Sequence, residues 1–179
     1  MSRLVAVEYL SLDGVFESPG WSGPYFDEEV QKFQYDNLFG SDALVLGRLT
    51  YEAFAAAWPG MATDEQGFGE RMNSLPKHVV TSSTATPEWN ASFITGDVDA
   101  QITELKNSDG GDLLINGSGD LVTYLTSKGL IDEYRFMIFP IILGQGRRLF
   151  PEGVGELPLR LTKSQVTPSG VAILTYEPA

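Results

Sequence analysis

The apolar positions of the chain form two patterns: short continuous runs, and longer segments in which apolar residues recur on one face. Short runs rich in apolar and β-branched residues are typical of strands that are buried in a sheet. We expect such strands at residues 3–12, 43–47, 77–83, 91–95 and 112–116. Longer segments with an apolar face are typical of helices. We expect helices at residues 26–39, 50–58, 63–75, 97–108 and 121–130.

The C-terminal part of the chain predicts β structure. A long strand is expected at 133–143, where Pro140 implies a bulge or a sheet edge, and a hairpin at 157–178 turns at 168–170. Strand and helix therefore alternate to about residue 140, and the hairpin follows. This order predicts a single α/β domain over residues 1–179 with three layers: a mostly parallel twisted sheet, helices on both faces and a C-terminal antiparallel hairpin.

The segment 13–25 differs from its neighbours because three glycines and two prolines interrupt it. These residues exclude a helix or a regular strand there. The segment also carries Phe16, Trp21 and Tyr25. Aromatic side chains in a glycine-rich loop indicate a flap over a pocket, and hydrophobic pinning of the loop explains them about as well.

Composition and charge narrow the function classes. The net charge of −12 would repel phosphates and anionic lipid, so neither nucleic acid nor a membrane is an expected partner. The chain has no Cys, which excludes thiol chemistry, and its His, Asp and Glu residues show no metal-ligand spacing. The N-terminal apolar stretch is too short for a signal peptide and no run approaches a membrane span, so we expect a cytoplasmic protein.

Three of the expected strands end in residues that suit an anion. These residues are Gly47, Arg48 and Thr50, then Ser82 and Ser83, and last the Gly-Ser-Gly turn at 117–119. Ligands of open α/β sheets bind beyond the carboxyl ends of the strands, where helix N-termini favour anions. Each signal alone has an ordinary explanation, such as a surface ion pair or a tight turn. Together they favour a phosphate-bearing dinucleotide, although the Rossmann glycine pattern is absent.

Six motifs in order make the chain resemble a known superfamily. They are "SLDGV", "LVLGRLTYE", "KHVVTSS", "LLINGSGDLV", "GLIDEYRFMIFPIILGQGRRLF" and "GVAILTYEP". Over nearly its whole length the chain is similar to the dihydrofolate reductase-like superfamily, and most closely to the branch of the reductase domain of bacterial riboflavin biosynthesis. The resemblance implies a reductase that transfers a hydride from NADPH to a small heterocycle, either a pterin or a 5-amino-6-(5-phosphoribosylamino)uracil-like compound.

The resemblance also implies which residues bind NADPH. In the family, the Gly-Arg-x-Thr segment holds phosphates and its arginine contacts the 2′-phosphate, the hydroxyl pair flanks the adenosine, and the late glycine turn contacts the pyrophosphate. The matching residues here are Gly47, Arg48, Thr50, Tyr51, Ser82, Ser83, Gly117, Ser118, Gly119, Asp120 and Leu121. Arg48 would then end a buried strand because a phosphate lies there, and its planar guanidinium suits that anion.

The substrate side departs from the family pattern. Folate reductases place a carboxylate on the first long helix, whereas the matching position here is near Gln31. Asp27, one turn earlier, could substitute as the catalytic carboxylate, but a solvated first-turn acid is the favoured role for it. The substrate pocket is expected to use Phe16, Trp21, Tyr25 and Asp13, although Asp13-Gly14 also forms turns readily. A cis peptide at Asn116-Gly117, where the family has paired glycines, is left open.

Two rival functions and a partner are also considered. The chain could be a non-catalytic nucleotide-binding module, or a structural dimer component that pairs through residues 133–143. A homodimer is expected because the apolar run 136–143 is long for an exposed sheet edge. Arg147 and Arg148 could bind a substrate phosphate, but pairing with Glu residues is favoured.

Overall fold

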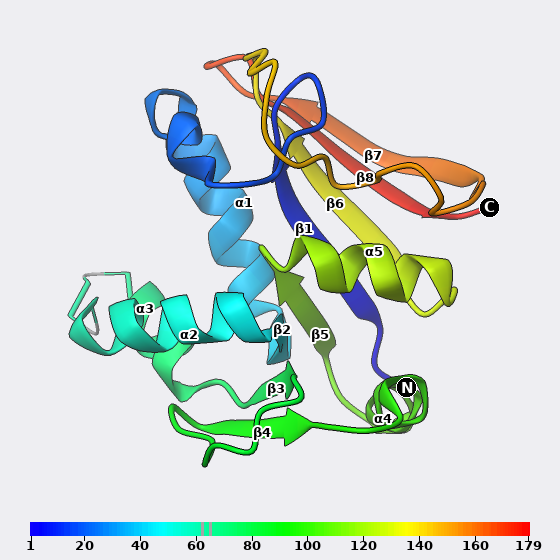
Figure 1. The fold of residues 1–179 in the computed structure, drawn as a ribbon. Helices are drawn as coiled ribbons and strands as arrows, with labels where there is room; N and C mark the ends of the chain where they lie inside the picture. Colours follow the sequence, from blue (N-terminus) through cyan, green and yellow to red (C-terminus); the bar gives the residue numbers. More distant parts are fainter. Residues whose placement is uncertain (62, 65) are drawn as a thin grey trace.

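The computed structural model describes residues 1–61, 63–64 and 66–179, and one sheet of eight strands organises them (Figure 1). The strands lie in the order β4-β3-β2-β5-β1-β6-β8-β7. Their bounds are β1 Leu4–Leu10, β2 Ser41–Gly47, β3 Lys77–Val80, β4 Ala91–Ile94, β5 Asp112–Asn116, β6 Glu133–Ile138, β7 Leu159–Val166 and β8 Ala172–Pro178. Strands β1 to β6 pair in parallel, and β8 and β7 add an antiparallel edge. The predicted α/β fold with a C-terminal hairpin is therefore confirmed.

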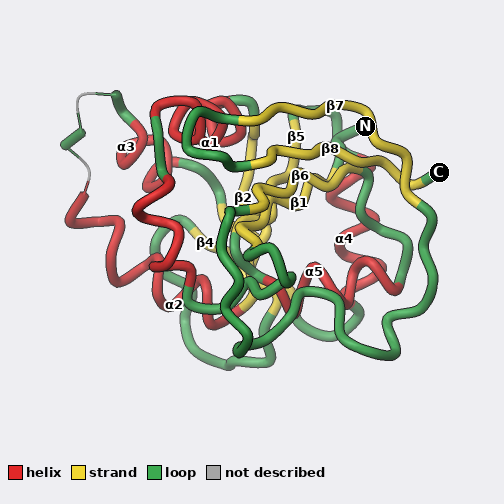
Figure 2. The backbone as a smooth tube through the Cα atoms, turned by 90° about the horizontal axis from the view of Figure 1, so that it is seen from above, coloured by secondary structure: helices red, strands yellow, loops and turns green. Residues whose placement is uncertain are grey.

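Helices cover both faces of this sheet (Figure 2). The α-helices are α1 Glu28–Phe39, α2 Arg48–Ala57, α3 Phe68–Ser74, α4 Val98–Asn107 and α5 Gly119–Ser127, and two 3₁₀ helices span Pro19–Tyr25 (η1) and Trp58–Met61 (η2). One apolar cluster joins the sheet to α4 and α5, and the other joins it to α1, α2 and α3. Among the described residues, no helix combines the length and apolar character needed to span a bilayer.

Strand β1 contributes to both apolar clusters because successive side chains of a strand point to opposite faces. Leu4 and Ala6 pack in the cluster with α5, whereas Val5 and Val7 pack in the cluster with α1. All four side chains are fully buried. The apolar start of the chain therefore becomes a central strand, as its composition indicates.

The sheet opens where β1 and β5 part. Their last paired residues are Val7 and Asn116, after which β5 turns away into α5. From Glu8 to Leu10, β1 continues with β6 as its neighbour. A gap between two parallel strands at their carboxyl ends is the place where open α/β sheets bind ligands.

The prediction for residues 133–143 is wrong in two respects. Strand β6 ends at Ile138, before Pro140, whose ring nitrogen could not donate to the sheet. It also lies between β1 and β8, so the run beginning at Phe136 is not an exposed edge. The outer strand on this side of the sheet is β7.

Local differences concern the loops and the helix ends. The segment Pro19–Tyr25 forms a 3₁₀ helix, so the exclusion of helix from residues 13–25 is wrong there. The helix expected at 63–75 is shorter, Phe68–Ser74, and positions 62 and 65 lie outside the described residues. Helix α5 is followed by a glycine cap, since Gly129 has a φ of 65° and its N–H donates to the carbonyl of Thr126.

Candidate functional site

A large cavity opens at the carboxyl ends of β1, β2 and β5, with a volume of about 1340 Å³. Its walls come from these strand ends, from α1, α2 and the first turn of α5, and from the loop after β1. Pockets that hold one small ligand usually measure about 300–1,000 Å³. The cavity therefore has room for two ligands side by side.

Eight of the eleven residues expected to bind a cofactor line this cavity. They are Gly47, Arg48, Thr50, Gly117, Ser118, Gly119, Asp120 and Leu121. Direct hydrogen bonds join the two halves of this set: the Gly47 N–H donates to Ser118 Oγ at 3.0 Å, and Thr50 Oγ1 donates to the Gly117 carbonyl at 3.4 Å. Two motifs far apart in the sequence thus form one wall.

The turn after β5 has a backbone that suits close approach by an anion. Gly117 has a φ of 75°, a conformation that side-chain-bearing residues rarely adopt. Gly119 begins α5, and the first N–H groups of a helix have no intrahelical partners and favour negative charge. No described peptide bond is cis, so the Asn116-Gly117 peptide is trans.

Phe16 covers this turn from the loop after β1. A Cβ added to Gly119 would overlap the Phe16 ring, and Phe16 also lines the cavity. The Arg147 guanidinium lies 5.3 Å from the centroid of the ring. Phe16 therefore takes the covering position that the sequence predicts for the loop aromatics.

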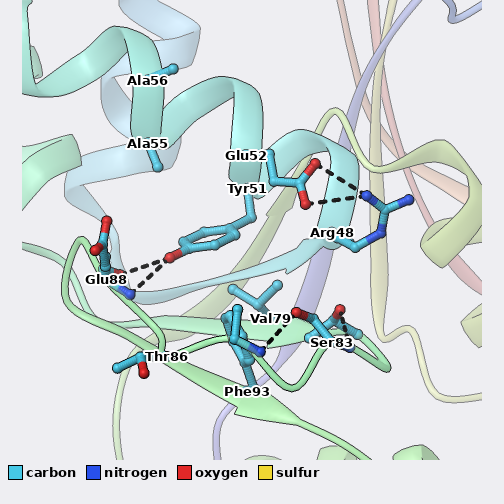
Figure 3. A pocket seen from close by; sticks show the side chains of 12 residues that line it. Arg48, Tyr51, Glu52, Ala55, Ala56, Val79, Ser83, Thr86, Glu88 and Phe93 are labelled. Atoms are coloured by element: carbon cyan, nitrogen blue, oxygen red, sulfur yellow. Dashed lines mark hydrogen bonds and ion pairs between the residues drawn. The ribbon is translucent and has the colours of Figure 1, made fainter.

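Arg48 lies between the large cavity and a second one. The second cavity measures about 460 Å³, and Arg48, Tyr51 and Ser83 are among the residues that line it (Figure 3). The Arg48 side chain is half exposed and pairs with Glu52, one helical turn along α2, at 3.1 Å. An exposed pair of this kind contributes little stability, so the guanidinium is free to bind a stronger anion.

The other three residues expected to bind a cofactor, Tyr51, Ser82 and Ser83, differ in their hydrogen bonds and in whether they line a cavity. The Tyr51 hydroxyl donates to the Glu88 carbonyl at 3.0 Å and accepts from the Glu88 N–H at 2.9 Å (Figure 3). Tyr51 therefore fixes the loop before β4, and its ring forms a wall of the second cavity. Ser83 Oγ accepts from the Ala85 N–H, and Ser82 lines neither cavity.

Trp21 and Tyr25 do not line either cavity, contrary to expectation. Their rings pack edge-on against Phe139, with centroids 5.6 and 6.4 Å away. The Trp21 indole N–H donates to the Glu17 carbonyl. These aromatics pin the loop to the end of β6, which is the alternative that the sequence left open.

Asp13 and Asp27 also lie outside the lining of both cavities, and both tie segments together. Asp27 accepts from the backbone N–H groups of Glu29 and Val30, which caps α1, and from the N–H of Ser169 in the β7–β8 turn. The hydrogen bonds from Ser169 and then Val30 hold the pKa of Asp27 well below its usual range. Asp27 is positioned as an ionised helix cap, outside the lining of both cavities.

Asp13 plays a similar part at the other end of the loop. It accepts hydrogen bonds from the Ser11 hydroxyl at 2.6 Å and from the N–H groups of Leu143 and Gly144. These bonds, with Ser11 first, hold the pKa of Asp13 well below its usual range. Its carboxylate also pairs with Arg148 at 3.7 Å.

The two neighbouring arginines pair with acids, as expected, but their nearest partners are aspartates and not the expected glutamates. Arg147 pairs with Asp120 at the start of α5 and lies 3.9 Å from a Glu17 oxygen. Arg148 pairs with Asp13. These pairs hold the loop before β7 against the loop after β1 and against α5.

Glu8 is the residue that the sequence reading missed. It lines the large cavity although its side chain is 2% exposed, and its Oε1 has no hydrogen-bond partner among the described residues. Burial raises the pKa of Glu8 to about 8. The signal was present in the sequence as one acid within an apolar strand. Next to it, the Tyr9 hydroxyl accepts from Gln34 Nε2 at 2.7 Å, and both of these residues also line the cavity.

This site divides into two chemically different halves. The half formed by β2, α2 and the turn after β5 offers a guanidinium, a hydroxyl and helix N–H groups, which are the donors that phosphates need. These donors fit a nicotinamide dinucleotide. The other half offers neutral amides, phenols and apolar rings from β1, α1 and η2, which suit a flat heterocycle. Among the described residues, no cluster of three metal-ligating side chains occurs.

Comparisons with known proteins show what this chain is similar to. A family model described as the RibD C-terminal domain matches residues 3–173. The uncharacterized protein YyaP of Bacillus subtilis is 24% identical over 97% of this chain and 94% of its own.

Two solved structures share the fold. A protein of Shewanella sp. PV-4, named for a proposed role in riboflavin biosynthesis, superposes with a TM-score of 0.78 at 24% identity over 100% of this chain and 99% of its own. Dihydrofolate reductase of Enterococcus faecalis, solved with NADP(H), superposes with a TM-score of 0.65 at 17% identity over 98% and 96% of the chains. The fold is therefore dihydrofolate reductase-like.

Proposed function

Because this chain belongs to the RibD C-terminal domain family, we propose that it is an NADPH-dependent reductase of a small heterocycle. The substrate is a pterin or a 5-amino-6-(5-phosphoribosylamino)uracil-like compound. The observation that carries this proposal is the joining of the Gly47–Thr50 and Gly117–Leu121 segments into one phosphate-suited wall of a cavity large enough for two ligands.

The chain's own residues would hold the cofactor along this wall. Arg48, at the border of the two cavities, would bind the 2′-phosphate, with Ser83 beyond it. The turn at Gly117–Gly119 would receive the pyrophosphate. With the phosphates held there, the nicotinamide would extend toward the cavity half that β1 and α1 line.

The bound nicotinamide would supply a hydride. The protein would contribute orientation and exclusion of water, because a near-attack geometry accounts for a large part of catalysis in such reactions. Phe16 covers the glycine turn. We call the half of the cavity that β1 and α1 line the substrate half, and the half at β2, α2 and the turn after β5 the cofactor half. Phe26, Phe54 and Phe68 contribute apolar side chains to the wall of the substrate half. The Gln31 and Gln34 side chains can hydrogen-bond to the edge of a heterocycle without adding charge.

A direct experiment tests the proposal. Purified protein is titrated calorimetrically with NADPH and NADH, and loss of reduced-nicotinamide absorbance is then followed with pterin and pyrimidine substrates. We expect tighter binding of NADPH and turnover with one of the two substrate classes. Absence of NADPH binding would contradict the proposal as a whole.

NADPH binding without turnover on any member of both classes would instead support a non-catalytic nucleotide-binding module. Glu52→Gln serves as a matched variant, because it removes the acid that pairs with Arg48 without changing the cavity shape. If Arg48 holds the 2′-phosphate, this variant should bind NADPH at least as tightly as the unmodified protein.

A further inference from the structure

Glu8 is a buried acid with no neighbouring group, in the described part of the chain, that would stabilise a negative charge on it. Its side chain is 2% exposed, its Oε1 has no hydrogen-bond partner among the described residues, and it lines the large cavity. An unpaired buried carboxylate is costly, so such a group either stays protonated or finds a partner. Burial raises the pKa of Glu8 to about 8, so at neutral pH the group is mainly a neutral carboxylic acid.

A second buried glutamate in this fold does have partners for its carboxylate. Glu133, on the adjacent strand β6, is 7% exposed and accepts from Arg3 at 2.8 Å and from Arg135 at 2.5 Å. Those arginines neutralise it away from the cavity. Glu8 has no comparable partner, and it faces the cavity instead.

The position of Glu8 is set by the parting of two strands. Val7 is the last β1 residue that pairs with β5, and Glu8 is the first that does not. On the β5 side of this point, the chain turns through Asn116 and Gly117 into α5, and both residues line the same cavity. Glu8 therefore lies at the junction of the cofactor half and the substrate half.

The charged and titratable groups around Glu8 do not stabilise its carboxylate, so the protonated carboxyl is favoured. Tyr9 is adjacent on β1, and burial raises its pKa to about 12, so it stays neutral. The β6 residue opposite Glu8 is Phe136, which is apolar. The others that line the cavity are Glu17, Tyr35, Arg48, Asp64, Asp120, Tyr124 and Arg147. Both cations in this set already pair with acids, Arg48 with Glu52 and Arg147 with Asp120.

The helix that faces the substrate half supplies no acid. The residues of α1 that line the cavity are Gln31, Gln34 and Tyr35, all of them neutral donors and acceptors. Asp27 caps α1 from outside the cavity. Glu8 is therefore the one nine-tenths-buried carboxyl among the described lining residues.

We propose that Glu8 is the catalytic acid that faces the substrate: its carboxyl binds a ring nitrogen or carbonyl oxygen of the heterocycle and protonates it during reduction. The inference rests on the proposed reductase function. An acid kept neutral by an apolar site can donate a hydrogen bond at neutral pH, which a carboxylate cannot. The substrate class that fits is a planar heterocycle with an imine or carbonyl group, met by Glu8 on one side and by amides on the other.

The proton balance is simple. A C=N or C=O double bond becomes a single bond when its carbon receives the hydride that NADPH supplies and its heteroatom receives the proton from the Glu8 carboxyl. Glu8 is left as a carboxylate and regains a proton from water before the next turnover. Ionised Glu8 could not start the cycle, so turnover should fall as the pH rises through about 8.

The first test needs no turnover. The carboxyl carbons of glutamate are labelled with ¹³C, and the Glu8 signal is identified as the one missing in Glu8→Gln. We expect its titration midpoint near pH 8, and a shift of this signal when millimolar pterin or uracil is added. A midpoint in the ordinary glutamate range, or a signal that neither compound shifts, would overturn the proposal.

The second test uses the pH dependence of turnover. Glu8→Gln keeps the size of the side chain and should lower kcat by about 10²- to 10⁴-fold, the usual contribution of general acid catalysis, while NADPH affinity stays unchanged. Glu133→Gln is the matched control, a buried glutamate outside the cavity lining, and should leave the pH profile of kcat unchanged. Unaltered kcat in Glu8→Gln would exclude the catalytic role.

The two proposals fail in different ways. If NADPH does not bind, the reductase function is wrong whatever Glu8 does. If NADPH binds and substrate is reduced equally well by Glu8→Gln, the reductase function holds and the role of Glu8 is wrong.

Discussion

The backbone N–H of Gly47 donates a hydrogen bond to the hydroxyl of Ser118 at 3.0 Å, across 71 positions of sequence. This bond joins the end of β2 to the turn that follows β5. Ser118 is 5% exposed, so water competes little for its hydroxyl. The starts of α2 and α5 are thereby held side by side on one cavity wall, and their helix N-termini can act on one anionic ligand.

Replacement of Arg48 should change the cofactor preference. Arg48→Ala should weaken NADPH binding by about 1.5–3 kcal/mol, roughly 10- to 150-fold, because a charge-assisted contact is lost. NADH lacks the 2′-phosphate, so its affinity should change little. Calorimetric titration of both cofactors measures the difference. Arg160→Ala, which removes a surface arginine paired with Glu177, is the control, and equal weakening of both cofactors by Arg48→Ala would contradict the assignment.

Gly117 can be compared with a glycine of the same backbone conformation elsewhere. Gly117 and Gly96 have φ values of 75° and 84°, so alanine should cost about 1–2 kcal/mol of stability at either position. Gly117→Ala should also lose NADPH affinity, because its Cβ would stand at the cavity wall, whereas Gly96→Ala should bind normally. Urea unfolding of both variants measures the cost of backbone strain, and NADPH titration measures the effect on binding. Normal NADPH affinity in Gly117→Ala would make the turn purely structural.

Asp27 should affect stability rather than catalysis. Asp27→Asn removes the charge at the start of α1 and the acceptor for the Ser169 N–H, so the melting temperature should fall. Turnover should not change, because Asp27 lies outside the cavity lining. Asp97→Asn at the N-terminus of α4 is the control: it caps through the Ala100 N–H, so it should cost less. A large loss of kcat in Asp27→Asn would restore it as a catalytic candidate.

The free energy of unfolding should depend on pH through Glu8. The pKa of this carboxyl rises from 4.5 to about 8 on folding. Between these values the unfolded state binds fewer protons than the folded state, so stability falls as pH rises. The slope should reach about 1.4 kcal/mol per pH unit.

The measurement is urea unfolding from pH 4 to 9 for the unmodified protein and Glu8→Gln. Other titrating groups are common to both proteins, so the difference between the curves isolates Glu8. The difference should decline between about pH 4.5 and 8 and be constant above that range. A difference that does not vary with pH would show that folding does not raise the pKa of Glu8.

The homodimer stays a prediction, but the strand expected to form its interface is now β7 instead of β6. Strand β6 is internal, whereas β7 forms an outer edge on which Leu161 and Val166 are 50% and 72% exposed. An unpaired edge with exposed apolar side chains favours pairing with a second copy. Light scattering at micromolar concentration should give a dimer mass, and Val166→Lys should shift it toward the monomer. A monomer mass for the unmodified protein would end this prediction.

Several features of the fold and the site followed from local sequence patterns. Apolar runs and turn residues are local signals, so the strands and the C-terminal hairpin could be predicted. The convergence of Arg48 and Gly117 also could be predicted, since the carboxyl ends of parallel strands meet at one sheet edge.

Other features depended on contacts that no local pattern contains. Trp21 could have covered a ligand or pinned a loop, and the choice was made by Phe139, a distant residue against which its ring packs. Asp27 could have faced the substrate, but the Ser169 N–H of the hairpin turn engages its carboxylate. Both side chains had two plausible partners, and packing between distant segments selected one.

The sequence by itself therefore determined the α/β architecture and the phosphate-suited strand ends, because periodicity and turn chemistry act over a few residues. The tertiary structure alone decided which acid faces the cavity and which strand forms the edge. Strand order places β6 beside β8, and the parting of β1 from β5 after Val7 opens the sheet at Glu8. Pairing between strands far apart in sequence is a long-range property, so a buried glutamate in an apolar strand became a cavity acid only in the folded sheet.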